Sequence, residues 1–359
     1  MGQDRGTDPN FPPNLSILPS ARNHFKAASP SAETDSEEDD PEQDIGTYGI
    51  AGRTWEAAYL LRQYLTPSSS NDIEFDPPCP LHDSPRQSTP RKRTILEVGS
   101  GTGFLSLALA PHLRSSDTLI LTDLENVCPL LEKNLSEARQ RWRRKKNETT
   151  DEATCLVKPL PWGDSSFLET SIKRPGLVPD YILASDLVYF PFLYPPLLQT
   201  LLGLTEYRAS DDPRRESKKG PTLIFSYKIR SLVREQPFWE AFGRWFEFEA
   251  VQAGKVEEET KEEAIEGGGT EVTPDKAKRK RIWTRFGAAH ESGSGKEDDS
   301  DELYIFIAHR RRSTLGISDV LEKGQATNED LMLGRNGLEG ELSGSGQFEE
   351  MLLAALEWD

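Results

Sequence analysis

The sequence predicts an α/β protein whose core is a doubly wound, mostly parallel sheet of seven strands. Three observations support this prediction. Short apolar runs alternate along the chain with amphipathic helical patterns, which is the order of a parallel sheet covered by helices on both faces. Runs such as TLILT at 118–122 and DYILA at 180–184 are apolar at most positions, as strands buried on both faces are. A glycine-rich turn, GSGTG at 99–103, joins the apolar run at 94–98 to the helix that follows it.

The elements in the first half of the chain can be placed one by one. An amphipathic helix is indicated by apolar residues at i, i+3, i+4 and i+7, namely Ala57, Leu60, Leu61 and Tyr64. Residues 66–92 are rich in Pro, Ser and Asp and are expected to form a disordered linker. Strands are expected at 94–98, 118–122 and 154–158, with helices at 104–113 and 127–138 between them.

The second half of the chain completes the seven strands. Strands are expected at 180–185, 222–227, 246–251 and 303–309, and helices at 193–204 and 237–246. No helical pattern separates the last two strands, so they are expected to form an antiparallel hairpin at one edge of the sheet. Residues 252–301 between them are charged and glycine-rich, and this segment is too long for an ordinary hairpin loop. It is expected to be a disordered insert.

One folded domain over residues 46–310 accounts for the apolar content. Hydrophobic residues make up 35% of the chain and charged residues 29%, which indicates a folded domain with disordered additions. Residues 1–44 carry the acidic run EEDD at 37–40 and are expected to be a disordered tail. Residues 311–359 are expected to be a low-order extension that ends in an amphipathic helix, marked by Phe348, Met351, Leu352 and Ala355.

Charge and cysteine usage exclude several classes of protein. A formal net charge of −17 argues against a protein that grips nucleic acid over a broad face. Cys79, Cys128 and Cys155 show no paired spacing, and neither do the five histidines, so neither a disulfide scaffold nor a metal site is expected. We expect no secretory signal, because the N-terminal residues contain no apolar segment, and the sequence contains no apolar run of membrane-spanning length. We therefore expect a cytoplasmic monomer that does not associate with membranes.

The strongest local motif is ILEVGSGTGF, in which a strand is followed by Gly99, Gly101 and Gly103 and then by a helix. Glycines at these positions permit a positive φ and let a ligand approach the backbone at a helix N-terminus. A dinucleotide site would require a third glycine at the position of Phe104, so that alternative is weakened. A plain glycine-rich turn without a ligand remains the other alternative.

Three further residues are candidates for ligand contacts. Asp123 closes the second strand, where a carboxylate can accept both hydroxyls of a ribose. Glu125 competes for that role, and Asp123 is also suited to cap the next helix. Trp162 follows the third strand and can pack beside an adenine, while packing in the core is the alternative. For Trp55, core packing is the more serious alternative.

Asp186 and Tyr189 follow the fourth strand, in ILASDLVYF. Ligands of open α/β sheets bind outside the carboxyl ends of the strands, so these two residues lie where chemistry is expected. The alternative is that Asp186 caps the following helix and that Tyr189 packs in the core.

These motifs together resemble the class I, seven-β-strand methyltransferases with a Rossmann-like fold, and within them the protein lysine methyltransferases that carry a DxxY motif. The resemblance runs over residues 46–309, with interruptions at the linker and the insert. It rests on AGRTWEAAYLL, ILEVGSGTG, LTDLENVCPLLEKNL, LPWGD, DYILASDLVYF and TLIFSYKIRSLVREQPFWEAF. The acidic tail, the insert and the C-terminal extension depart from the family pattern and leave the choice of partner open.

The resemblance implies S-adenosylmethionine as the cofactor and a protein as the substrate. It implies cofactor contacts by a set of residues around the glycine turn and the strand ends, namely Trp55, Glu97, Gly99, Gly101, Gly103, Asp123, Trp162, Ala184 and Ser185. It also implies that Asp186 and Tyr189 flank an acceptor lysine. Within that family the chain resembles the fungal branch that acts on translation elongation factor 1-alpha, which makes that factor an expected partner, and the family also contains enzymes that act on chaperones and on AAA ATPases.

The chemistry implied by this resemblance requires a neutral amine as the nucleophile. An unperturbed lysine has a pKa near 10.4, so roughly one in a thousand is neutral near pH 7.4. A desolvated channel beside a cationic sulfonium lowers that pKa, and oriented oxygens align the lone pair for attack. Methylation of the exocyclic amines of bases is disfavoured, because two prolines usual in that motif are absent after Asp186.

Two other functions remain open from the sequence. One is methylation of a small nitrogen compound, for which the acceptor pocket would be closed rather than open to a protein surface. The other is an inactive, cofactor-binding module that recruits partners. The presence of Glu97, the three glycines, Asp123 and Asp186 argues against the inactive module.

Overall fold

The computed structural model describes residues 9–12, 15–20, 40–67, 73–82, 92–145, 152–206, 220–257, 280–287, 303–316, 327–335 and 346–354. At its centre is a seven-stranded sheet with the order β4-β3-β2-β5-β6-β10-β7. Its strands are β2 (Thr94–Val98), β3 (Thr118–Asp123), β4 (Thr154–Pro159), β5 (Tyr181–Ser185), β6 (Thr222–Lys228), β7 (Phe246–Ala250) and β10 (Leu303–Arg310). Strands β2 to β6 pair in parallel and β10 is antiparallel to both of its neighbours. The predicted fold class and the antiparallel edge are therefore confirmed.

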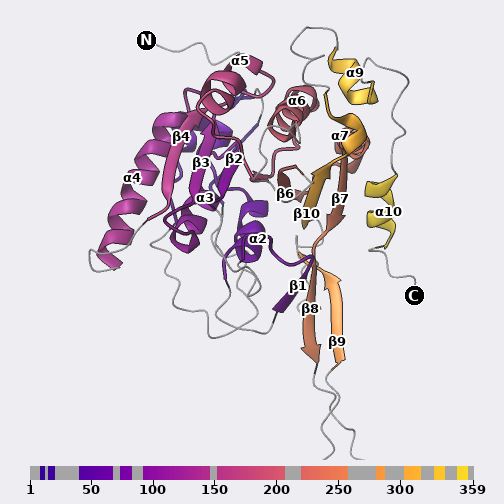
Figure 1. The fold of residues 1–359 in the computed structure, drawn as a ribbon, viewed down its shortest axis with the longest axis horizontal. Helices are drawn as coiled ribbons and strands as arrows, with labels where there is room; N and C mark the ends of the chain where they lie inside the picture. Colours follow the sequence, from indigo (N-terminus) through magenta and orange to yellow (C-terminus); the bar gives the residue numbers. More distant parts are fainter. Residues whose placement is uncertain are drawn as a thin grey trace, which may run out of the picture.

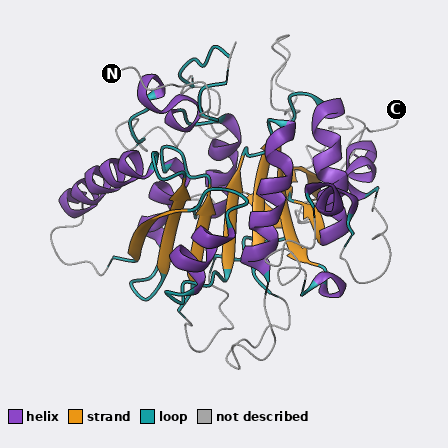
Figure 2. Cartoon of the chain, turned by 90° about the horizontal axis from the view of Figure 1, so that it is seen from above, coloured by secondary structure: helices purple, strands orange, loops and turns teal. Residues whose placement is uncertain are grey.

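Helices cover both faces of this sheet (Figure 2). One face packs against α2 (Glu56–Leu65), α3 (Phe104–Leu109) and α4 (Cys128–Lys145), and the other against α6 (Tyr194–Thr205) and α7 (Leu232–Trp245). Successive strand residues point to opposite faces, so Ile95 joins the first core while Leu96 and Val98 join the second. All three are fully buried. This double burial explains why the strand sequences are almost continuously apolar.

The remaining helices are short. They are α1 (Ile45–Tyr48), η3 (Gly49–Gly52), η4 (Ala110–His112), α5 (Ser165–Phe167), η5 (Leu168–Lys173), η6 (Pro191–Leu193), η8 (Arg312–Thr314), α9 (Asn328–Leu333) and α10 (Gln347–Ala354). Helix α7 begins at Leu232, five residues before the predicted start, and contains Pro237 in its second turn.

A second, three-stranded antiparallel sheet corrects two expectations. It has the order β1-β8-β9, formed by β1 (Ile73–Asp76), β8 (Gln252–Glu257) and β9 (Lys280–Arg285), and it projects away from the main sheet (Figure 1). Residues 66–92 and 252–301 were expected to be disordered, which is wrong for these strands. Pairing across a wide sequence separation, with Ile73 opposite Lys255, stabilises strands too polar to be recognised individually. Residues 68–72, 83–91, 258–279 and 288–302 lie outside the description.

Parts of the acidic N-terminal tail also pack on the domain, so the expectation of disorder over 1–44 is wrong for residues 9–12, 15–20 and 40–44. The carbonyl of Asn10 accepts a hydrogen bond from the Ile50 amide at 3.0 Å. Gln43 bonds to both Ser20 and the Thr54 amide, which ties the two tail segments to the start of the domain. Residues 1–8, 13–14 and 21–39 lie outside the description.

The C-terminal extension contains the predicted helix and one that was not predicted. In α10, the ring of Phe348 stacks on Trp239 of α7 at 5.0 Å, so the terminal helix docks on this domain. The side chains of Met351 and Ala355 lie outside the description. Helix α9 begins with a capping box between Thr327 and Asp330, and the Trp245 indole donates to the Leu331 carbonyl at 2.8 Å.

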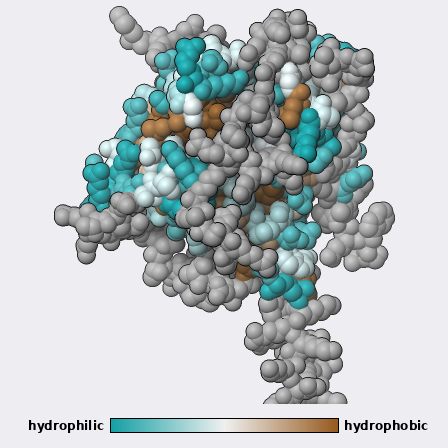
Figure 3. All heavy atoms as spheres, in the orientation of Figure 1, coloured by the Kyte–Doolittle hydropathy of each residue, from teal (hydrophilic) through white to brown (hydrophobic). Residues whose placement is uncertain are grey.

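The parallel register brings the strand ends to one edge of the main sheet. Val98 pairs with Ala184, Asp123 lies opposite Pro159, and Ser185 lies opposite Ser226. On the face drawn in Figure 3, hydrophobic residues are visible at the surface in several patches. No helix in the described part of the chain is long and apolar enough to cross a membrane.

Candidate active site

A hollow opens at this carboxyl edge of the sheet, with an empty volume of about 600 Å³, part of which is open to solvent. It is lined by the ends of β2, β3 and β5 and by the segment that leads into α2. Nine of the residues expected to form the site line it together: Trp55, Glu97, Gly99, Gly101, Asp123, Trp162, Ser185, Asp186 and Tyr189. Asn10 also lines it, so the N-terminal segment contributes to its wall.

The glycine turn after β2 forms the floor of the hollow. Gly99, Gly101 and Gly103 all have a positive φ, of 64°, 54° and 77°. A Cβ on Gly101 would lie 2.9 Å from the carbonyl oxygen of Ala51, a backbone atom that cannot easily move. Glycine is therefore required both by the backbone conformation and by the close approach of η3.

Glu97 is a buried carboxylate at the end of β2, with 3% of its surface exposed. Its Oε2 accepts a hydrogen bond from the Ser106 hydroxyl in α3. Burial raises the pKa of Glu97 to about 7, and the hydrogen bonds from Ser106 and Ser100 lower it only in part. A carboxylate that is desolvated in this way gains from a cationic partner.

Asp123 stands beside the glycine turn and is bound to it directly. One carboxylate oxygen accepts the Gly101 amide and the other accepts the Leu124 amide, both at 2.8 Å. Burial raises the pKa of Asp123 to about 6. Helix α4 begins only at Cys128, so Asp123 does not cap it. Glu125, the competing candidate for the ribose, is exposed and does not line the hollow.

Two expected residues do not line the hollow. Gly103 precedes α3, and a Cβ placed on it would point at Leu131 and Leu121 in the core. Ala184 is fully buried within β5, on the face covered by α6 and α7. Any contact that these two residues make with a ligand must come from their backbone.

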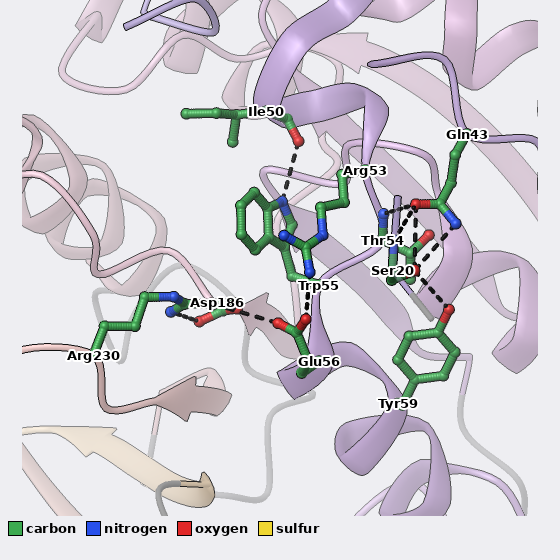
Figure 4. Close-up of polar contacts among 10 residues, drawn as sticks. All are labelled: Ser20, Gln43, Ile50, Arg53, Thr54, Trp55, Glu56, Tyr59, Asp186 and Arg230. Atoms are coloured by element: carbon green, nitrogen blue, oxygen red, sulfur yellow. Dashed lines mark hydrogen bonds and ion pairs between the residues drawn. The ribbon is translucent and has the colours of Figure 1, made fainter. Parts of the chain in front are cut away.

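Asp186 follows β5 and is the one non-glycine residue with a positive φ, 60°, among those described. Its carboxylate is held by both terminal nitrogens of Arg230, with Nη1 to Oδ1 at 2.7 Å and Nη2 to Oδ2 at 2.5 Å (Figure 4). The next helical turn, η6, begins five residues later, at Pro191. Asp186 therefore makes an ion pair rather than a helix cap.

Arg230 belongs to a charged cluster around Trp55, which the sequence did not reveal. Arg230 and Arg53 lie over the Trp55 ring at 5.3 Å and 4.2 Å from its centroid (Figure 4). Glu56 pairs with Arg53 and lies 3.8 Å from Arg230. The Trp55 indole donates to the Ile50 carbonyl at 3.1 Å. The position of Arg230, two residues beyond β6 at the carboxyl edge, was the available signal for its place in the site.

Tyr189 links the hollow to the outer surface. Its ring contacts Trp162 at 6.4 Å and Phe190 at 4.9 Å, and Phe190 stacks on Phe192 at 5.5 Å. Phe192 is 64% exposed. Burial raises the pKa of the Tyr189 hydroxyl above its usual value, so it stays a neutral phenol. The row of rings runs from the hollow to solvent.

These features suit a cationic, nucleoside-like ligand. Two buried carboxylates, Glu97 and Asp123, stand beside a glycine turn that permits close approach, and Trp55 and Trp162 supply aromatic walls. The donor set fits S-adenosylmethionine, which carries an ammonium, a ribose, an adenine and a sulfonium. Within the described residues, no group of three or more His, Cys, Asp or Glu side chains is placed to hold a metal ion.

Comparison with known proteins gives a consistent result. A model of a family described as lysine methyltransferase matches residues 34–241. Protein-lysine N-methyltransferase EFM6 of Saccharomyces cerevisiae is 25% identical over 228 residues, which cover 61% of this chain and 80% of that protein. Protein-lysine N-methyltransferase EFM3 of Chaetomium thermophilum is 27% identical over 200 residues, which cover 55% of this chain and 48% of that protein.

A vertebrate relative and a solved structure are also similar. Protein N-lysine methyltransferase METTL21A of Danio rerio is 27% identical over 45% of this chain and 59% of its own length. The chain thus spans about half the length of EFM3 and three-fifths of that of METTL21A. The CurJ carbon methyltransferase structure has a TM-score of 0.31 and 15% identity, and covers 62% of this chain and 50% of that chain.

Proposed function

The chain belongs to the lysine methyltransferase family, and from that premise we propose that it transfers methyl groups from S-adenosylmethionine to a lysine side chain of another protein. The observation that carries the proposal is that Asp186 and Tyr189, which follow β5, line the same hollow as the glycine turn and the buried carboxylates of Glu97 and Asp123. The exposed ring of Phe192, reached from Tyr189 through Phe190, supports an acceptor site that borders an open surface.

The residues of the hollow have distinct roles in binding the cofactor. Glu97 would hold its ammonium group and Asp123 its ribose hydroxyls, while Gly99 and Gly101 let it lie against the backbone. Trp162 would pack beside the adenine. The bound cofactor supplies an electrophilic methyl group, whose bond to sulfur breaks as the bond to the lysine nitrogen forms, with the electron pair left on sulfur.

The residues on the acceptor side position the amine. Asp186 presents carboxylate oxygens, and Tyr189 a neutral hydroxyl, to the lysine nitrogen. The aromatic walls of Trp55, Trp162 and Tyr189 exclude water, which favours the neutral form of the amine. The amine releases its proton to water before the transfer, and the lone pair is then aligned for attack.

Translation elongation factor 1-alpha is the first substrate to test, on the sequence resemblance to the fungal branch that acts on it. We further propose that the protein works in the cytoplasm as a monomer and without nucleic acid. The unpaired thiols of Cys79, Cys128 and Cys155 are consistent with a reducing compartment. The net charge of −17 does not favour contact with nucleic acid.

The test uses S-adenosylmethionine labelled in its methyl group, with purified elongation factor 1-alpha and with a eukaryotic lysate. We expect label on a protein lysine with the wild type, and a loss of about 100-fold or more with Asp186→Asn because positioning is removed. Glu125→Gln is the matched control, since Glu125 is an exposed carboxylate outside the hollow. Label in small molecules alone would contradict the proposal. Label on another protein would retain the activity and reject the factor.

A further inference from the structure

We propose that Arg230 keeps the acceptor lysine in its neutral, nucleophilic form by neutralising Asp186 and by placing a fixed positive charge beside the amine. Arg230 is then a positioning residue for the transfer, acting through Asp186. The inference rests on the proposed function, since it concerns the amine that this function places at Asp186.

The pairing of Arg230 with Asp186 is the starting observation. The guanidinium contacts both carboxylate oxygens, at 2.7 Å and 2.5 Å, and the Asp186 side chain is only 1% exposed. Burial alone would lower the pKa of Arg230, yet its pairing with Asp186 raises that pKa above the usual value, so the guanidinium stays charged over the working pH range. The guanidinium is thus a permanent positive charge beside the carboxylate of Asp186.

An unpaired Asp186 would work against the reaction. A carboxylate within about 4–6 Å of a lysine favours the ammonium form and raises its pKa by roughly 1–3 units. Each unit would reduce the fraction of neutral amine about tenfold at neutral pH. A site that used a free aspartate to hold lysine would therefore bind the acceptor well and leave it unreactive.

The paired carboxylate can still guide the amine. A carboxylate offers about four lone-pair positions, and the bidentate guanidinium occupies two of them. The Lys228 amide lies 3.4 Å from Oδ1, at the outer limit of a hydrogen bond. Room remains for one N–H of the amine, so Asp186 can act as an oriented acceptor without a net negative charge.

The other carboxylates around Arg230 have partners of their own. Glu56 of α2 lies 3.8 Å from Arg230 and is paired with Arg53. Glu235 of α7 accepts the backbone amide of Arg230 at 3.1 Å and the Tyr227 hydroxyl. Asp123 and Glu97 line the part of the hollow proposed for the cofactor, and the hydroxyl of Tyr189 stays neutral. Arg230 is therefore the group that decides the charge seen at Asp186.

The test measures the single-turnover rate of methyl transfer at saturating substrate between pH 6.5 and 9.5, because that rate reports the ionisation of the bound amine. With Arg230→Gln, the rising limb should move up by about one pH unit, so the rate falls roughly tenfold at pH 7 and much less at pH 9.5. Arg230→Lys, which retains the charge, should lie close to the wild type. Arg234→Gln is the matched control, because Arg234 is exposed on α7 four residues further along.

A double variant, Asp186→Asn with Arg230→Gln, keeps the test decisive if the single variant folds poorly. It removes the negative charge along with the guanidinium, so the pH at which its rate rises should return toward that of the wild type, although the rate itself stays low at every pH because Asp186 no longer positions the amine. Cofactor affinity, measured by calorimetry for each variant, reports folding independently of transfer.

Three results would overturn the inference. Arg230→Gln could lower the rate by one factor at every pH, which would indicate a structural role alone. It could bind the acceptor more tightly and react faster at pH 7. That result would mean that Arg230 only occupies the position beside Asp186 that the acceptor lysine takes. A wild type that binds cofactor but labels no protein at any pH would overturn the proposed function, and this inference with it.

Discussion

The side-chain carboxyl groups of Glu97 and Asp123 lie in a buried site that disfavours their charged forms. Burial raises the pKa of Glu97 to about 7 and that of Asp123 to about 6. At a pH between the ordinary carboxyl pKa and these raised pKa values, the two carboxyl groups hold protons in the folded chain and have released them in the unfolded chain. The free energy of unfolding of the cofactor-free protein should therefore be greatest at low pH within this window, and fall as the pH rises toward 7.

Replacing Glu97 with glutamine should flatten this dependence. The glutamine side chain stays neutral and its carbonyl can still accept from Ser106, so the Glu97→Gln variant should be more stable than the wild type at pH 8, by of order 2 kcal/mol. Urea denaturation at pH 5, 6, 7 and 8 measures this difference, and Glu125→Gln serves as the exposed control. An unchanged slope in the Glu97→Gln variant would show that Glu97 does not titrate in this range.

Some residues of the site could be predicted from the sequence and others could not. Asp123, Asp186 and the glycines were predicted because each follows a strand, and the carboxyl ends of parallel strands meet at one edge. Arg230 and Glu56 were not predicted, because an ion pair between α2 and the segment after β6 exists only once these parts of the chain pack together. The place of Arg230 just beyond a strand was its one available signal, and nothing in the local sequence of Glu56 distinguishes it from an ordinary surface charge.

The glycine turn can be tested as an element against a matched turn elsewhere. Gly176 has a positive φ of 74° and open space around it, whereas Gly101 has a φ of 54° and faces the Ala51 carbonyl. Gly176→Ala should cost about 1–2 kcal/mol for the left-handed conformation alone. Gly101→Ala should cost more and abolish cofactor binding, because η3 must move.

Thermal unfolding and cofactor calorimetry on the two variants measure these effects. Equal losses of stability, together with wild-type cofactor affinity in Gly101→Ala, would contradict the role assigned to close approach at this turn.

The strands of the small sheet were missed because they have no local signal of pairing. Strand β1 presents Ile73 and Phe75 in a polar stretch, and its partner β8 lies far along the chain, so neither strand has a local signal of pairing. By contrast, the buried strands of the main sheet are recognisable because both of their faces must be apolar. The capping box of Thr327 and Asp330 was the available signal for α9, although no hydrophobic period accompanies it.

For the whole molecule, the long connection between β8 and β9 offers a test of modularity. Glu257 and Lys280 are the last paired residues, and the small sheet projects away from the main one (Figure 1). Replacing residues 258–279 with Asn-Gly should leave the cofactor affinity unchanged. The shorter loop should raise the free energy of unfolding by roughly 1–2 kcal/mol, through its lower closure entropy.

Calorimetry and urea denaturation measure both quantities, with the full chain as the reference. A weaker affinity for the cofactor would show that this connection communicates with the hollow. If only transfer to the protein substrate were lost, the segment would be assigned to partner recognition.

The placement of β10 between β6 and β7 has a consequence for biosynthesis. Strand β7 pairs with β10 and is separated from β6 by it, so β7 has no neighbour in the main sheet until Arg310 has been made. The ribosome must add 64 residues after Phe246 before that happens, which takes about 3–13 s at typical elongation rates. During this interval the apolar side of β7 and the aromatic residues of α7 are incompletely covered. A nascent chain stalled there should be a substrate for chaperones, whereas one extended past β10 should not.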